Sequence, residues 1–244
     1  MMNDTQAYNF PVKFEDVHYI ASLYTANTNK VNDLLNGTGL KAGLHFFGKP
    51  VVALGLIEYK VSDLGTYNEI ILAIPVIQAH EKTGWKNWLD LYSGFNNRKG
   101  GQFIIHIPVT TQRSVDAGRQ IWGYPKTLLP ILHEFSDGKI NTSLMDTDNQ
   151  LLLEVSGKLG AGIAIPAMNL MTYSFLNEYL TKTTVDVESG MQWKPNSNLR
   201  IQVKNNKHAI CKDIVALGIN NKRPIFTIES IHFKASFNEG QQIS

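Results

Sequence analysis

The pattern of apolar and polar positions along this chain predicts a protein built mainly of β-strands. Several runs are rich in β-branched and aromatic residues, or alternate between apolar and polar positions, as half-buried strands do. We predict strands at residues 17–25, 51–61, 67–76, 101–110, 139–144, 151–155, 199–204 and 226–237. Because the turn-forming cluster Asp146-Thr147-Asp148-Asn149 separates two of these runs, they are expected to form a hairpin.

Helical periodicity is confined to four short segments. They cover residues 29–35, 114–120, 170–180 and 210–217. Many strands, few helices and no regular alternation of the two predict an α+β fold that is mainly antiparallel, with a barrel-like sheet and peripheral helices. We find no internal repeat, linker or low-complexity stretch, so the chain is expected to form one domain over residues 1–244.

The segment from Gly118 to Pro130 contains the most informative single residue, Lys126. It reads Gly-Arg-Gln-Ile-Trp-Gly-Tyr-Pro-Lys-Thr-Leu-Leu-Pro, and the residues around Lys126 are aromatic or apolar. If the segment is extended, side chains alternate between two faces, so Trp122, Tyr124, Lys126 and Leu128 share one face. Pro125 then fixes the backbone immediately before the lysine.

A lysine in such surroundings is a candidate nucleophile. Removal from water penalises the charged ammonium and favours the neutral amine, whose natural reaction partner is the carbon of a ketone or aldehyde. The alternative is a lysine whose stem lies along the aromatic residues while its head stays in water. Under the first reading, Lys126→Met is expected to fold at least as well as the parent chain, because it removes a costly buried amine.

These residues resemble those of the acetoacetate decarboxylase family, which carries a Gly-Arg-Glu element followed by an aromatic-Pro-Lys-Lys element. Here the corresponding residues are Gly118-Arg119-Gln120 and Tyr124-Pro125-Lys126-Thr127. A second likeness runs through Tyr67-Asn68-Glu69 to Ala73-Ile74-Pro75-Val76, and a weaker one lies between His208 and Gly240.

The resemblance implies a cone-shaped antiparallel barrel with Lys126 pointing into its cavity. It implies a Schiff-base-forming lyase that decarboxylates a small β-keto acid such as acetoacetate, in which Lys126 and Glu69 are catalytic. The remaining substrate-binding candidates are Arg119, Trp122, Tyr124 and Tyr67. The lysine takes the place of any cofactor or metal, and a homo-oligomer is expected.

Four positions depart from the family pattern. Thr127 replaces the second lysine, and Gln120 replaces the glutamate of the Gly-Arg-Glu element. A rough alignment also places Val17 where the family has an arginine and Leu54 where it has a second glutamate. An arginine there would hold a substrate carboxylate. Two alternatives therefore stay open, namely aldolase or dehydratase chemistry on another oxo acid by the same lysine, and a non-catalytic barrel that binds small molecules.

Composition narrows the class of protein. Of the 244 residues, 43% are hydrophobic and 18% are charged, and the net charge is +2. Without a basic block, nucleic-acid binding has little electrostatic support. No apolar run approaches the ~20 residues of a spanning helix, so no membrane partner is expected. The single cysteine, Cys211, excludes an internal disulfide and suits a reducing cytoplasm; its amphipathic surroundings predict core packing.

Other chemically active residues have weaker support. The seven histidines show no close pair at metal-ligand spacing, and His106 is expected to be a hydrogen-bonded core residue. Lys158 is the one rival nucleophile, but the glycines around it are typical of a turn. Arg119 is equally suited to a structural ion pair and to holding a substrate.

Overall fold

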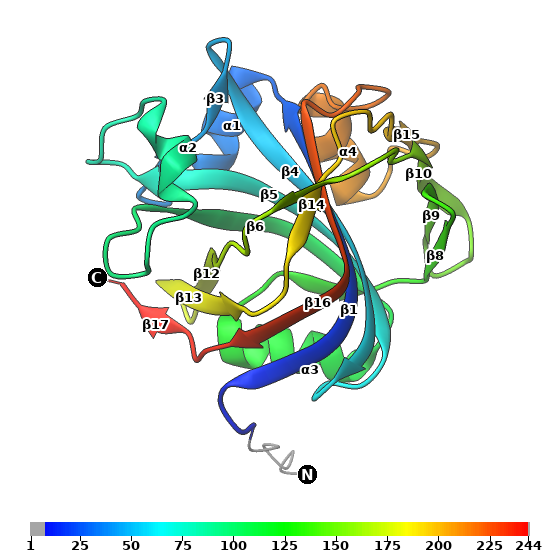
Figure 1. The fold of residues 1–244 in the computed structure, drawn as a ribbon, viewed down its shortest axis with the longest axis horizontal. Helices are drawn as coiled ribbons and strands as arrows, with labels where there is room; N and C mark the ends of the chain where they lie inside the picture. Colours follow the sequence, from blue (N-terminus) through cyan, green and yellow to red (C-terminus); the bar gives the residue numbers. More distant parts are fainter. Residues whose placement is uncertain (1–7, 244) are drawn as a thin grey trace.

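The computed structural model describes residues 8–243, in which a long, strongly curved sheet closes on itself to form a barrel (Figure 1). The ring of hydrogen-bonded strands runs in the order β16 (Phe226–Phe237), β1 (Val12–Thr25), β4 (Lys49–Ser62), β5 (Tyr67–Gln78), β6 (Gly100–Val109), β12 (Leu170–Leu176) and β13 (Tyr179–Val187). Pairing of β13 with β16 closes the ring. Its neighbours are antiparallel except β6 and β12, which run parallel. The predicted α+β, mainly antiparallel barrel is therefore confirmed.

Shorter strands extend this sheet, and a second sheet lies beside it. The extensions are β2 (Leu40–Ala42), β3 (His45–Phe46), β7 (Lys126–Leu128), β11 (Ile163–Ile165), β14 (Met191–Trp193) and β17 (Gln241–Gln242). The second sheet has the order β15 (Arg200–Val203), β10 (Leu151–Lys158), β9 (Lys139–Met145) and β8 (Ile131–Ser136). Its β9–β10 pair is the hairpin predicted around Asp146–Asn149.

The strands β4 and β5 are buried on both faces, which explains their nearly continuous apolar sequence. Leu54, Leu56, Ile70 and Leu72 belong to an outer core that also includes residues of α1 (Thr28–Leu35), α4 (Ala209–Ala216) and the second sheet. Alternate residues point the other way, into the barrel. The barrel therefore has a solid outer wall and a separate interior.

Helix α3 (Gln112–Trp122) lies across one end of the barrel, seen at the bottom of Figure 1. Thr111 caps its first turn through a hydrogen bond from the Ser114 amide. Gly123 ends it in the left-handed conformation, at φ 66°, and its amide reaches the last carbonyls of the helix. A side chain at Gly123 would collide with the Phe175 backbone at 2.2 Å. The chain therefore turns sharply just before Lys126.

Most predicted elements are confirmed, with one clear error. All eight predicted strands are present, as are the helices expected at 29–35, 114–120 and 210–217. The helix expected at 170–180 is wrong, because this segment forms strand β12 and the start of β13. Asn177 and Glu178 between them both have positive φ values, 51° and 69°, as a tight two-residue hairpin turn requires.

The extended reading of residues 118–128 is also corrected. Trp122 ends a helix, and only Lys126–Leu128 form a strand. Leu128, which was expected on the same face as Lys126, is 47% exposed. Among residues 8–243 the structure contains no helix with the length and apolar character needed to cross a membrane.

Candidate active site

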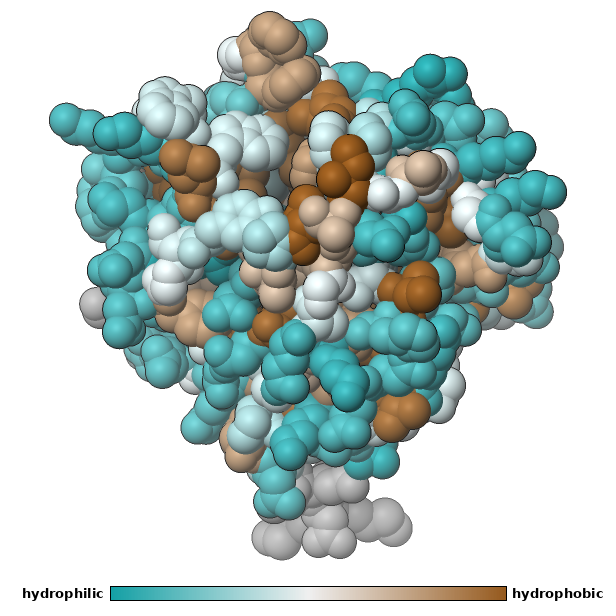
Figure 2. Space-filling model, in the orientation of Figure 1, coloured by the Kyte–Doolittle hydropathy of each residue, from teal (hydrophilic) through white to brown (hydrophobic). Residues whose placement is uncertain are grey.

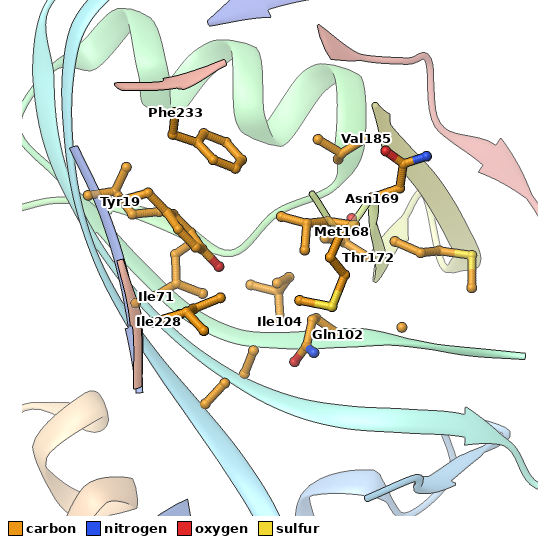
Figure 3. Close-up of a pocket in the computed structure, with 18 of the residues that line it drawn as sticks. Tyr19, Ile71, Gln102, Ile104, Met168, Asn169, Thr172, Val185, Ile228 and Phe233 are labelled. Atoms are coloured by element: carbon orange, nitrogen blue, oxygen red, sulfur yellow. The ribbon is translucent and has the colours of Figure 1, made fainter. Parts of the chain in front are cut away.

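The barrel encloses a cavity of about 330 Å³, lined mostly by apolar side chains. Figure 3 shows Tyr19, Ile71, Ile104, Val185, Ile228 and Phe233 directed into this one space from strands β1, β5, β6, β13 and β16. Within the part of the chain that the structure describes, only three ionisable groups other than tyrosines line it: Glu69, Arg98 and Lys126. The cavity is therefore an apolar chamber with very few charges.

Lys126 enters this cavity from the first position of β7. The strand pairs in parallel with the end of β6, where Lys126 lies opposite Ile107. Lys126 is 3% exposed, Thr127 points to the opposite side of the strand and is half-buried, and Leu128 at the strand end is exposed. The structure thus places the predicted nucleophile inside a water-poor cavity and not at a solvated strand end.

Glu69 is the direct partner of Lys126. Lys126 Nζ lies 2.7 Å from Glu69 Oε2 and 2.9 Å from Ser114 Oγ, and the glutamate is 2% exposed. The hydroxyl of Tyr59 donates to the other carboxylate oxygen, Oε1, at 3.1 Å. A buried charge is tolerated when it is paired and hydrogen-bonded, and both members of this pair are.

Two stacked tyrosines complete this end of the cavity. The rings of Tyr59 and Tyr67 lie 4.1 Å apart, and Lys126 Nζ lies 5.3 Å from the centre of the Tyr67 ring, a cation–π distance. Burial, and then the charge of Glu69, raise the pKa of both phenols well above the usual value of 10. Both hydroxyls therefore remain protonated at physiological pH: Tyr59 donates to Glu69, and Tyr67 keeps a donor that is free within residues 8–243.

Trp122 and Tyr124 also line the cavity, although Trp122 reaches it from the end of α3 and not from the extended strand that the spacing predicted. Their rings are stacked at 5.6 Å. The Trp122 indole donates to the Asn238 carbonyl at 2.9 Å, and the Tyr124 hydroxyl contacts Thr172 Oγ1 at 2.6 Å. Burial raises the pKa of Tyr124 above its usual value. With their polar atoms engaged elsewhere, these two residues present aromatic surface to the cavity.

Arg119 does not reach the cavity, although the sequence made it a candidate for substrate binding. It lies on the exposed side of α3, and its guanidinium donates two hydrogen bonds to the backbone carbonyl of Lys126. Arg119 therefore contacts the backbone of Lys126 on the side away from the cavity and holds β7 against the helix.

The four departures from the family pattern fall in different surroundings. Val17 is fully buried and lines the cavity, opposite Tyr59 in the β1–β4 register. Leu54 points to the outer core, so the cavity-facing positions of β4 are its neighbours Ala53 and Gly55. Gln120 is exposed on α3, and Thr127 is half-buried in β7, outside the cavity lining. The cavity therefore has an apolar residue at the position where an arginine was expected.

The other chemically active residues considered from the sequence lie outside the cavity lining. Lys158 is exposed at the end of β10, outside the cavity. Cys211 is fully buried in the outer core, as predicted. His106 is hydrogen-bonded as predicted, to Asp213 at 2.7 Å on the outer side of β6, but it is partly exposed and not a core residue. In residues 8–243, no group of three or more His, Cys, Asp or Glu side chains is arranged to hold a metal ion.

Apolar residues also surround the mouth of the cavity. Trp88, Leu91 and Tyr92, in and after α2 (Lys86–Asp90), contribute to its lining. The neighbouring Trp85 and Leu89 are 71% and 60% exposed. Figure 2 shows apolar and aromatic side chains gathered in the upper part of this face, around a hollow.

Sequence reasoning missed two members of the site, Tyr59 and Ser114. Tyr59 carried a usable signal: it lies directly opposite Tyr67 in a hairpin whose two strands were both predicted. Ser114 carried none, because its contact with Lys126 depends on how α3 packs across the barrel.

Comparison with known proteins places these features in context. A family model described as acetoacetate decarboxylase matches residues 2–192. The crystal structure of acetoacetate decarboxylase from Legionella pneumophila superposes with a TM-score of 0.69 at 16% identity, covering 100% of this chain and 92% of that one. An acetoacetate decarboxylase-like enzyme from Sphingomonas wittichii superposes with a TM-score of 0.64 at 11% identity, covering 100% of this chain and 98% of that one. The enduracididine biosynthesis enzyme MppR, complexed with the condensation product of pyruvate and imidazole 4-carboxaldehyde, gives 0.67 at 12% identity, with 99% and 92% coverage. No curated protein sequence matches.

Proposed function

Because this chain belongs to the acetoacetate decarboxylase family, we propose that it is a Schiff-base-forming carboxy-lyase that acts on a β-oxo acid through Lys126. The observation that carries the proposal is the buried contact of 2.7 Å between Lys126 Nζ and Glu69 Oε2 at one end of an apolar cavity. No cofactor takes part in this chemistry.

The contact suits activation of the amine. A proton that moves from Nζ to Glu69 leaves a neutral amine and a neutral carboxyl group, and a water-poor cavity favours this pair of neutral groups more than water does. The amine then attacks the substrate ketone, the ketone oxygen leaves as water, and a protonated iminium links Nζ to the former carbonyl carbon.

The iminium performs the carbon chemistry. Its positive charge accepts the electron pair of the bond that breaks as carbon dioxide leaves, which gives a neutral enamine. Glu69 gives up its proton when the ketone oxygen leaves as water, so it takes a new proton from solvent and delivers it to the enamine carbon, which regenerates the iminium. Attack by water then releases the ketone product and restores the Lys126 amine.

The other residues of the site have supporting roles in this scheme. Tyr59 fixes the orientation of Glu69 through Oε1, and Ser114 holds Nζ near the carboxylate. Tyr67, Trp122 and Tyr124 line the space for the substrate and keep water out. Arg119 acts as a positioning residue, because it touches only the Lys126 backbone.

A second candidate function keeps the iminium but performs aldol or dehydration chemistry on another oxo acid. The apolar residue Val17 in the cavity wall favours it, because Lys126 is the one side-chain cation that the described residues provide at this end of the cavity, and Arg98 lies at the other end. Retention of the carboxylate on the substrate would be compatible with such a site.

Borohydride trapping with a panel of oxo acids, followed by peptide mass spectrometry, tests the proposal. A reduced adduct on Lys126 together with carbon dioxide release supports the carboxy-lyase. An adduct on Lys126 without carbon dioxide supports the aldolase or dehydratase. No adduct with any compound would favour a binding barrel without catalysis, and an adduct only on Lys158 would show that the wrong lysine was chosen. Lys126→Met and Lys158→Gln are the matched control variants.

A further inference from the structure

The shape of the cavity away from Lys126 follows from three successive rows of paired residues. The row nearest Lys126 contains Tyr19, Ile57 and Glu69, which lie side by side on β1, β4 and β5. The next inward-facing row contains Ala21, Gly55 and Ile71, and the third contains Leu23, Ala53 and Ala73. Most residues of the second and third rows are small, and they leave open space along this wall.

The spacing of strands gives the length of this space. Inward-facing rows are separated by two residues, which is about 7 Å, so the third row lies roughly 13 Å beyond Glu69. The cavity therefore continues well past the space that a substrate as small as acetoacetate fills beside Lys126.

The charges of the cavity are concentrated at its ends. Glu69 and Lys126 occupy one end, whereas Arg98 precedes β6 at the other. Arg98 is engaged with the backbone carbonyls of Asp90, Leu91 and Asn169. Ile107, which faces Lys126, lies seven steps along the strand from Gly100, a distance of about 23 Å. Arg98 is therefore too far away to hold a carboxylate next to the reacting carbonyl.

One polar group near Lys126 has no hydrogen-bond partner in the described part of the chain. The hydroxyl of Tyr67 is buried and unpaired, and its side chain lines the cavity beside Nζ. A buried donor of this kind is stabilised when a ligand oxygen accepts from it. Farther along the cavity, among the described residues, Gln102 Oε1 on β6 is a second buried polar atom without a partner, but it is an uncharged acceptor. A donor for the reacting carbonyl is therefore provided at the lysine end, and none of the described residues that line the cavity between that end and Arg98 is charged.

Resting on the proposed function, we infer that the substrate is a carbonyl compound with an elongated apolar tail and no second charged group along that tail. The reacting carbonyl lies between Lys126, Glu69 and Tyr67. The tail follows the wall of Ala21, Gly55, Ala53 and Ala73 towards the apolar mouth. For a β-oxo acid of this class, the product is a long-chain methyl ketone.

The inference is tested with a series of methyl ketones, 2-butanone, 2-hexanone and 2-octanone, by measuring the concentration that half-saturates borohydride inactivation. Each methylene buried is worth about 0.8 kcal/mol, so this concentration is expected to fall roughly fourfold per added methylene. The charged analogue 7-oxooctanoate is expected to need at least ten times the concentration of 2-octanone. Equal values along the series, or tighter binding of 7-oxooctanoate, would overturn the inference.

A cavity-filling variant provides a second, independent measurement. A β-carbon at Gly55 would meet its nearest neighbour, Ile71, at 3.5 Å, an ordinary contact, so Gly55→Leu places its side chain in the cavity. We expect Gly55→Leu to raise the half-saturating concentration of 2-octanone at least tenfold more than that of 2-butanone. Gly190→Leu, on an open and exposed turn, is the matched control.

Failure of the proposed function and failure of the apolar-tail inference give different experimental results. If no ketone or oxo acid forms an adduct on Lys126, the proposed function fails. If adducts form on Lys126 without preference for chain length, and Gly55→Leu affects both ketones equally, the proposed function stands and the apolar substrate class is wrong.

Discussion

The side chain of Lys126 crosses helix α3 directly over Gly118. A β-carbon at Gly118 would lie 2.5 Å from Cδ and 2.7 Å from Cε of the lysine. Real β-carbons do not approach other carbon atoms so closely, so the path of the lysine into the cavity requires glycine at this point of the helix. The Gly-Arg element that precedes the lysine in sequence thus has a physical role for each residue: Gly118 gives space to the side chain, and Arg119 holds the backbone.

Gly118→Ala is expected to displace Lys126 without unfolding the protein. Alanine is favoured over glycine inside a helix by about 1 kcal/mol, which offsets part of the strain. Displacement of Nζ from Glu69 by about 1 Å is expected to lower the rate of adduct formation roughly 100-fold. Borohydride inactivation rates and thermal unfolding measure the two effects. Gln120→Ala, on the exposed side of the same helix, is the control, and an unchanged rate in Gly118→Ala would show that the lysine has another route to the cavity.

The pairing of Lys126 with Glu69 reverses one expectation drawn from the sequence. An unpaired buried amine would make Lys126→Met neutral or stabilising. The structure instead pairs the amine with a buried carboxylate, and removal of one partner leaves the other uncompensated. We expect Lys126→Met to lower the free energy of unfolding by about 3 kcal/mol.

The double variant Lys126→Met with Glu69→Gln separates the two explanations. It removes both charges, so most of the lost stability is expected to return, as when a buried ion pair is replaced as a whole. Urea unfolding of both variants at pH 7.5 measures the difference. If the single variant is as stable as the parent protein, the ion pair does not stabilise this fold.

The strands and the central lysine could be predicted because their signals are local. Long runs of β-branched, aromatic or alternating residues identified β1, β4, β5 and β6, and the aromatic setting of Lys126 identified the nucleophile candidate. The contact with Glu69 could not be derived from spacing alone, because 57 residues separate the two. Only the family resemblance brought them together before the structure did.

The errors have physical reasons as well. The segment at 170–180 has apolar residues at helical spacing, yet hydrogen bonding to β6 and the tight turn at Asn177 favour a hairpin. Arg119 was a substrate-binding candidate because the sequence cannot tell which side of α3 faces the barrel. In the structure, the side that bears Ser114 and Gly118 is buried, and Arg119 lies on the other side.

Arg119→Met is expected to act on the rate of reaction and not on substrate affinity. The variant loses the two hydrogen bonds to the Lys126 carbonyl, so the lysine is held less firmly while the cavity wall stays intact. We expect kcat to fall about tenfold, with KM changed less than twofold. Steady-state kinetics with the preferred substrate provide both values, and Arg119→Lys is expected to recover part of kcat. A large rise in KM at constant kcat would mean instead that Arg119 binds substrate.

His133 on β8 gives the protein a predictable loss of stability in mild acid. Burial lowers the pKa of its imidazole from 6.5 to about 4. Between these values the unfolded chain carries a proton on this ring that the folded protein does not. The free energy of unfolding therefore falls as the pH is lowered from about 6.5 towards 4, by up to about 3 kcal/mol.

His133→Gln isolates this contribution from that of all other titrating groups. Glutamine does not titrate and retains a polar atom for Thr142, which His133 contacts through Nδ1 at 2.9 Å. Between pH 7.5 and 5.0 the parent protein is expected to lose about 2 kcal/mol more stability than the variant, because most of the unfolded chain becomes protonated at this position over that range. Urea unfolding of both proteins at the two pH values gives the comparison. Parallel losses in the two proteins would mean that His133 takes up its proton as readily in the barrel as in the unfolded chain.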